Sequence, residues 1–251
     1  MTLDLLGESV SDREMAEKAA SGILMTLEAI AGHKLNSHVS VKLSQLGVCF
    51  DPAFCLEQMR RICACAAQLG IFIRIDMEDS SLTQTTLELY RQLAAEFGHE
   101  TIGIVIQAYL YRSEEDIAEL VKMGANVRIV KGAYHEPPEL AFPRKKDVDY
   151  NYLHLAQSLL ASGCYTAIAT HDEQMIALLN MFAEAEDIDR EQFEFQMLYG
   201  IRPALQRQLA SEGYKVRVYT PFGDQWYPYF TRRIAERPAN LWFVAKGLFA
   251  K

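Results

Sequence analysis

Charged and amide side chains end several otherwise apolar segments of this chain. Lys42, Asp76 and Gln107 each follow a short run of β-branched or aromatic residues. A buried charge without a partner is costly, so such residues are either paired or placed where a ligand needs them. Lys42 and Asp76 could form an ion pair inside the fold, but so many polar ends favour a binding site.

Similar polar ends occur later in the chain. In Arg128–Tyr134 two cations precede and flank Gly132 and Ala133, small residues that let a large anionic or planar ligand approach the backbone. Another apolar run ends in Thr170-His171, and two more end in Leu198 and Tyr219. An ion pair in the protein interior remains an alternative role for the two cations.

A second group of charges lies near the end of the chain. Tyr229, Arg232, Arg233 and Glu236 stand at positions i, i+3, i+4 and i+7, which places them on one face of a helix. Two neighbouring guanidiniums can clamp a carboxylate or a phosphate. A solvated charged face is the alternative.

Eight short apolar segments alternate with helical patterns, and they have to position these side chains. The expected strands are Leu3–Leu6, Val39–Leu43, Phe72–Asp76, Gly103–Gln107, Val127–Lys131, Ala167–Thr170, Glu194–Met197 and Val216–Tyr219. Their nearly continuous apolar character is typical of parallel strands buried on both faces.

The segments between the strands have helical periodicity. The expected helices are Asp12–Ala31 with Ser11 as N-cap, Asp51–Leu69 with Pro52 in its first turn, Leu82–Phe97, Glu114–Met123, Asp149–Ala161, Asp172–Ala183, Pro203–Ser211 and Gln225–Arg237. The charged segment 143–147 is expected to be a loop. Strand and helix repeated eight times predict an α/β fold, a single (β/α)8 TIM-type barrel over residues 1–251, with the last helix over the active-site mouth.

Composition excludes several other classes of protein. The formal net charge of −8 argues against a nucleic-acid binder. No GxGxxG follows the first strand and no P-loop is present, which disfavours an open nucleotide-binding sheet. The five cysteines lack zinc-site spacing and are expected to be free and mostly buried, with no metal. Without a recognisable leader, we expect a cytoplasmic protein; peripheral contact with the inner face of the membrane stays open.

Taken in order, the polar segments resemble those of the proline dehydrogenase family of flavoenzymes. The matching pieces are Val39–Leu43, Arg74–Glu78, Val105–Tyr109, Arg128–Tyr134, Ala169–His171, Glu194–Gly200, Val218–Pro221 and Tyr229–Arg233. They cover nearly the whole chain. The resemblance implies a barrel that binds FAD without a Rossmann motif and oxidises L-proline to Δ1-pyrroline-5-carboxylate.

The same resemblance implies roles for individual residues. Asp76, paired with Lys42, and Arg128, close to the flavin, would act in catalysis. The proline carboxylate would be bound by Lys42, Arg232 and Arg233, and its ring enclosed by Tyr134, Leu198, Tyr219 and Tyr229. FAD would contact Met77, Gln107, Arg128, Val130, Lys131, Gly132, Ala133, Tyr134, Thr170 and His171. Tyr219 would leave no room for a hydroxyl on ring C4 and so favour proline over 4-hydroxyproline.

Partners follow from the resemblance too. A membrane quinone is the expected electron acceptor, and a separate pyrroline-5-carboxylate dehydrogenase is the expected downstream enzyme. Family members commonly have extra helices before the first strand, so this chain would be a minimal or trimmed form.

Two other interpretations remain. The barrel could be a lysine-dependent aldolase, with Lys42 or Lys131 forming a Schiff base and Arg232 and Arg233 binding phosphate. Alternatively, it could bind flavin or proline without catalysis, for regulation.

Overall fold

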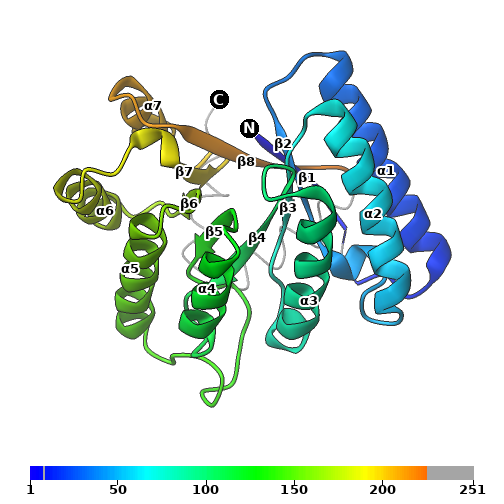
Figure 1. Ribbon diagram of the computed structural model, residues 1–251, viewed down its shortest axis with the longest axis horizontal. Helices are drawn as coiled ribbons and strands as arrows, with labels where there is room; N and C mark the ends of the chain where they lie inside the picture. Colours follow the sequence, from blue (N-terminus) through cyan, green and yellow to red (C-terminus); the bar gives the residue numbers. More distant parts are fainter. Residues whose placement is uncertain (8, 225–251) are drawn as a thin grey trace, which may run out of the picture.

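Residues 1–7 and 9–224 are described by a computed structural model, in which eight parallel strands close into a barrel (Figure 1). The strands pair in chain order, and β8 closes the sheet against β1. The predicted (β/α)8 fold is therefore confirmed. The strands are β1 Thr2–Leu5, β2 His38–Val41, β3 Ile73–Ile75, β4 Ile102–Gln107, β5 Val127–Val130, β6 Thr166–Ala169, β7 Phe193–Leu198 and β8 Val216–Phe222.

Helices surround the strands on the outside (Figure 1). They are α1 Arg13–Gly32, α2 Pro52–Leu69, α3 Ser80–Phe97, α4 Ser113–Lys122, α5 Lys145–Ala161, α6 Glu173–Ala185 and α7 Pro203–Ser211, with short 3-10 helices η1 Leu43–Leu46 and η2 Arg190–Gln192. The helix predicted for Gln225–Arg237 lies outside the described residues.

Two local predictions were wrong. The N-cap of α1 is Asp12 and not Ser11, because the Asp12 carboxylate accepts a hydrogen bond from the Met15 amide at 2.9 Å. The charged segment 143–147 is not entirely a loop, since α5 already begins at Lys145. There Arg144 and Lys145 form ion pairs with Asp147 and Asp149, which lie within the first helical turns and stabilise this early start.

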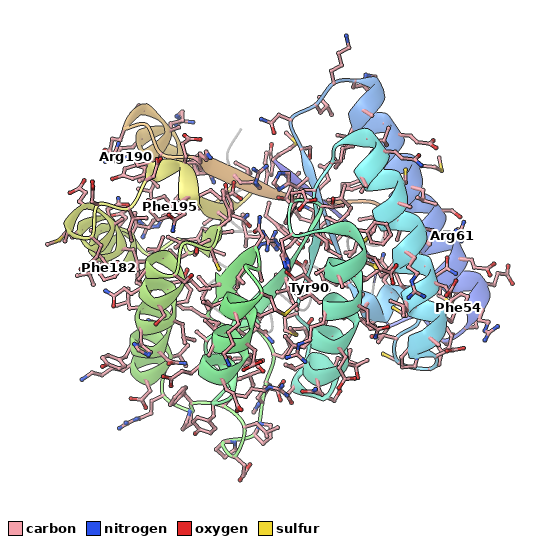
Figure 2. All side chains as sticks on the ribbon, viewed as in Figure 1. Phe54, Arg61, Tyr90, Phe182, Arg190 and Phe195 are labelled. Carbon is pink, nitrogen blue, oxygen red and sulfur yellow. The ribbon has the colours of Figure 1, made fainter. Side chains whose placement is uncertain are left out.

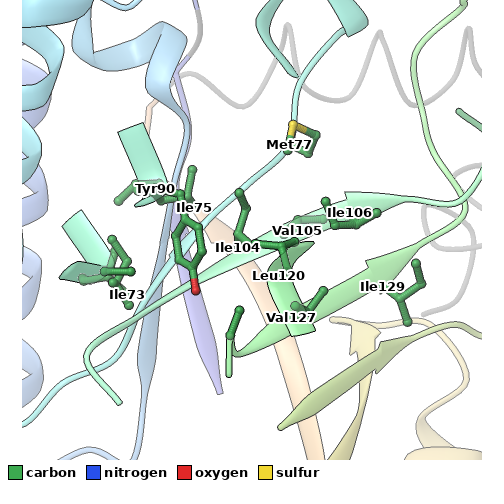
Figure 3. Close-up of a cluster of buried hydrophobic side chains, with 14 of the residues drawn as sticks. Ile73, Ile75, Met77, Tyr90, Ile104, Val105, Ile106, Leu120, Val127 and Ile129 are labelled. Atoms are coloured by element: carbon green, nitrogen blue, oxygen red, sulfur yellow. The ribbon is translucent and has the colours of Figure 1, made fainter. Parts of the chain in front are cut away.

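Side chains alternate between the two faces of the barrel wall. Ile73 and Ile75 of β3, Ile104 and Ile106 of β4, and Val127 and Ile129 of β5 belong to the buried layer that contains Tyr90 and Leu120 of the surrounding helices (Figure 3). Val105 and Val130, on the other face of the same strands, line the cavity. Figure 2 shows the dense packing of this layer, to which Tyr90 of α3 and Phe195 of β7 contribute fully buried rings. The apolar contacts that stabilise the fold thus lie between the strands and the helices.

The interior of the barrel is polar, which differs from the expectation of strands apolar on both faces. Arg74 is 2% exposed, and its guanidinium donates to the carbonyls of Ile104 and Asn126 at 2.9 and 2.7 Å. Gly103 makes room for it, because a Cβ at this position would lie 2.5 Å from Arg74 Nη1. Burial, with Arg128 nearby, lowers the pKa of Arg74 to about 9, so the group stays charged at neutral pH.

An ion pair occupies the end of the barrel where the strands begin. Arg217 contacts both oxygens of Glu194, at 2.7 and 2.8 Å, and Tyr165 donates to the same carboxylate at 3.1 Å. Burial alone would raise the pKa of Glu194, but Arg217 lowers it to about 2. Burial and the charge of Arg217 lower the pKa of His38, at the start of β2, to about 3. His38 is therefore neutral in the folded protein.

The five cysteines are free, as predicted. Cys55, Cys63 and Cys164 are buried, Cys65 is half-buried, and Cys49 is exposed, so the expectation of burial was wrong for Cys49. In the described stretches, no helix combines the length and the apolar composition needed to cross a bilayer.

Replacing His38 with Gln is expected to flatten the acid-side loss of stability. The unfolded chain binds a proton at His38 below its ordinary pKa of 6.5, whereas the folded protein does not until about pH 3. As the pH falls from 6.5 to about 3, the free energy of unfolding therefore decreases, and this group contributes at most about 1.4 kcal/mol per pH unit to the decrease. Urea unfolding of both proteins between pH 4.5 and 7 measures the difference; parallel curves would contradict the assignment.

Candidate functional site

A cavity of about 780 Å³ opens at the ends of the strands that lead into the helices. This is the end of a (β/α)8 barrel at which active sites form. The described residues predicted to act in catalysis, substrate binding or cofactor binding all line it: Lys42, Asp76, Met77, Gln107, Arg128, Val130, Lys131, Gly132, Ala133, Tyr134, Thr170, His171, Leu198 and Tyr219. Tyr229, Arg232 and Arg233 lie outside the described residues.

Lys42 lies at the floor of the cavity and pairs mainly with Asp4. Its Nζ atom is 2.9 and 3.0 Å from the two carboxylate oxygens of Asp4 and 3.8 Å from Asp76. The predicted pair of Lys42 with Asp76 is therefore present only as the longer contact. Asp4 was missed by the sequence analysis, although a single carboxylate within the apolar strand Leu3–Leu6 was the available signal.

Asp76 is held by two other groups. Arg128 Nη1 lies 2.7 Å from one carboxylate oxygen, and the Tyr219 hydroxyl donates to the other at 2.8 Å. The Arg128 guanidinium also lies over the Tyr219 ring, 5.4 Å from its centroid, and donates to Ser40 at 3.2 Å. Asp76, Arg128 and Tyr219 thus form one rigid group from three strand ends.

These contacts fix the protonation of two groups. Burial by itself would lower the pKa of Lys42, but the carboxylates of Asp4 and Asp76 outweigh it and raise the pKa above the usual lysine value. Burial, together with the same two carboxylates, raises the pKa of Tyr219 well above its usual value. At neutral pH the cavity floor therefore presents an ammonium and a neutral phenol.

The outer part of the cavity is also charged. Lys131 Nζ lies 2.6 Å from Asp149 and 3.7 Å from Asp172, and so ties the segment after β5 to α5 and α6. Arg202, ahead of α7, pairs with Glu173 at the start of α6. Arg202 and Glu173 line the cavity, yet the sequence analysis missed them because they follow the strand ends by several residues.

Backbone groups orient two further polar side chains of the wall, His171 and Gln107. His171 Nε2 accepts a hydrogen bond from the Leu198 amide at 2.9 Å, so the ring carries its proton on Nδ1. Gln107 Nε2 donates to the Glu78 carbonyl at 2.8 Å. In the part of the chain that the structure describes, no three His, Cys, Asp or Glu side chains are grouped to hold a metal ion.

Comparison of the sequence with known proteins identifies a family to which it is similar. The sequence profile of a family described as proline dehydrogenase matches residues 1–246. The chain is 46% identical to proline dehydrogenase 1 of Bacillus subtilis (strain 168) over 250 residues, which are 100% of this chain and 82% of that protein. It is 47% identical to the proline dehydrogenase of Deinococcus radiodurans over 249 residues, 98% of this chain and 80% of the relative.

A crystal structure of a larger protein contains a similar barrel. Proline utilization A (PutA) from Bdellovibrio bacteriovorus, inactivated by N-propargylglycine, superimposes with a TM-score of 0.86 at 28% identity. The match covers 93% of this chain but only 29% of that protein. The profile match and the two close relatives extend over almost the whole sequence, and this chain belongs to the proline dehydrogenase family.

Proposed function

We propose that this protein oxidises L-proline to Δ1-pyrroline-5-carboxylate with bound FAD as the hydride acceptor. The observation that carries the proposal is Lys42 at the floor of the cavity, with its Nζ atom 2.9 and 3.0 Å from the carboxylate oxygens of Asp4, in a chain of this family. An ammonium fixed by buried carboxylates suits a small carboxylate substrate. Arg232 and Arg233 are proposed as the other ligands of this carboxylate.

The residues present fit a flavin. The cavity volume of about 780 Å³ falls in the usual range for cofactor sites. Arg128 Nε is buried in the cavity wall without a hydrogen-bond partner among the described residues, so a donor is available to a ligand. Lys131, Lys145 and Arg202 line the outer part, where they suit the pyrophosphate of FAD.

The flavin, when bound, would supply a two-electron acceptor, its N5 atom, for the hydride that leaves proline C5. Lys42 orients the substrate through its carboxylate, and orientation of this kind accounts for much of the rate enhancement in reactions without a protein nucleophile. Arg128, held by Asp76, places positive charge where negative charge develops. Tyr134, Leu198, Tyr219 and Tyr229 are the proposed walls around the ring, and the backbone at Gly132 and Ala133 would contact the cofactor.

The lysine-dependent aldolase is the less suitable alternative. A Schiff-base lysine needs a lowered pKa so that its neutral amine can attack a carbonyl. The pKa of Lys42 is instead raised, and Lys131 is paired with Asp149 at 2.6 Å.

We extend the proposal to partners and location. A quinone in the membrane would reoxidise the flavin, and a pyrroline-5-carboxylate dehydrogenase would consume the product. We propose a cytoplasmic protein that meets the membrane from its inner face. Support for a linked second activity comes from the match to the bifunctional protein PutA of Escherichia coli, 28% identical over 285 residues and 21% of that protein.

The purified protein, supplied with FAD, is expected to show the absorption band of oxidised flavin and to lose it on anaerobic addition of L-proline. Pyrrolidine, which lacks the carboxylate that Lys42 would bind, is the matched control and should leave the band nearly unchanged. A protein that binds no FAD, or whose flavin stays oxidised with proline, would refute the proposal. Trapping of a lysine adduct by borohydride would favour the aldolase.

Asp4→Asn is expected to weaken proline binding most strongly at alkaline pH. Asp4 helps to raise the pKa of Lys42, so its loss lets the ammonium deprotonate at a lower pH. If the pKa of Lys42 falls by one unit, the rise of KM at alkaline pH begins about one pH unit lower. At a pH above both pKa values, KM of the variant is then roughly tenfold higher than that of wild type. KM and kcat between pH 7 and 10 measure this shift.

The matched control for this experiment is Asp116→Asn on α4. It breaks the 2.8 Å ion pair with Arg112, the residue before this helix, and neither residue lines the cavity. It should keep the wild-type pH profile. Identical profiles for Asp4→Asn and wild type would show that Asp4 does not control the charge of Lys42.

A further inference from the structure

Glu136 is a half-buried carboxylate in the connection between β5 and α5, and it belongs to none of the groups discussed so far. One of its oxygens accepts a hydrogen bond from the Ser80 amide at 2.7 Å, and the other accepts one from the Ser80 hydroxyl. The Tyr109 hydroxyl lies 3.5 Å from the first oxygen. A connection after β5 is thereby fastened to the segment after β3.

The position of Ser80 strengthens this link. Ser80 is the first residue of α3, and its amide is among the donors at the helix start that lack a partner within the helix. The positive end of the helix dipole stabilises a carboxylate there, and Asp79 accepts from the next amide, of Ser81, at 3.0 Å. Hydrogen bonds to an ionised carboxylate are stronger than those between neutral groups.

The link joins two walls of the cavity. Ser80 follows Asp76 and Met77 by a few residues, and Glu136 lies two residues after the segment 131–134. Asp76, Met77 and the segment 131–134 all line the cavity. The 76–80 segment is fixed on its other side as well, because buried Glu78 accepts from the Ser44 amide at 2.9 Å. Between the two walls, Glu136 provides a direct side-chain connection.

The segment 131–134 is tightly placed against Tyr109. Gly132 has φ +117°, a conformation that favours glycine, and a Cβ there would lie 2.4 Å from the Tyr109 ring. Farther along, the Phe142 amide donates to the Tyr109 carbonyl at 2.8 Å. The Tyr109 ring therefore packs against this segment, and Glu136 connects it to the start of α3.

We propose that Glu136 is a positioning residue for the flavin, acting through the Ser80 contact to keep the 131–134 segment and the Met77 segment at the spacing that the cofactor needs. This inference rests on the proposed function for the identity of the cofactor. The contact itself concerns only residues of this chain. Weakening it is expected to loosen the segment and to speed cofactor release.

Glu136→Gln tests the proposal in the holoprotein. Gln keeps the shape but replaces the carboxylate with a neutral amide, so FAD release on dilution, followed by flavin fluorescence, is expected to become roughly tenfold faster. Glu139→Gln, an exposed carboxylate of the same connection, is the matched control and should release FAD at the wild-type rate. An unchanged release rate in Glu136→Gln would overturn the proposal.

Two further variants show whether the Ser80 contact carries the effect. Ser80→Ala keeps the backbone donor and removes the hydroxyl, so a smaller acceleration of about threefold is expected. The double variant should release FAD no faster than Glu136→Gln alone, because both changes break the same contact. Additive effects would overturn the assignment to Ser80. Should Glu136→Gln fail to fold, Ser80→Ala decides the question by itself.

Hydrogen exchange separates this proposal from the proposed function. Peptides covering 131–136 and 77–80 are expected to exchange faster in Glu136→Gln than in wild type, with or without FAD. If hydrogen exchange of these peptides were the same in Glu136→Gln and wild type, the positioning role would be refuted even if the protein binds FAD. If wild type bound no FAD, the proposed function would fail, while faster exchange in the variant would still support the contact.

Discussion

The structure depends on the pairing of charges inside a closed barrel. Asp76 and Arg128 are 2.7 Å apart, and Asp4 binds Lys42 at 2.9 Å, all at positions largely removed from water. Burying any one of these charges without a partner would cost much free energy, and removing one partner would leave the other in that state. The cluster can therefore exist only as a set, and its members come from four different strands or strand ends. The charges can therefore pair only when the barrel is correctly closed, and the paired charges then form the polar floor of the cavity.

The alternation of side chains along each strand separates stability from chemistry. On β3, β4 and β5 the isoleucines and Val127 face the helices, where they contribute apolar burial. The residues between them, which include Arg128 as well as Val105 and Val130, face the barrel interior. A change on the outer face acts on packing, whereas a change on the inner face acts on a network of charges. Gly103 belongs to the second kind despite its lack of a side chain, because it gives the Arg74 guanidinium its space.

The order and type of the elements could be predicted from the sequence because each strand is short, apolar and bounded by turn-forming residues. Much of the lining of the cavity could be predicted because polar ends of apolar strands gather on one rim in this fold. Pairing could not: which carboxylate meets Lys42 depends on the stagger of β1 against β2, which local sequence does not encode. Glu136 and Arg202 could not be predicted for a similar reason, since contacts with residues far away in the chain, Ser80 and Glu173, position them.

The hydrogen bond from the Leu198 amide has a consequence for the chemistry of His171. A main-chain amide has only a proton to offer, so the lone pair of Nε2 is permanently engaged as long as β6 and β7 stay aligned. Through this bond the imidazole links the ends of β6 and β7 at the wall of the cavity.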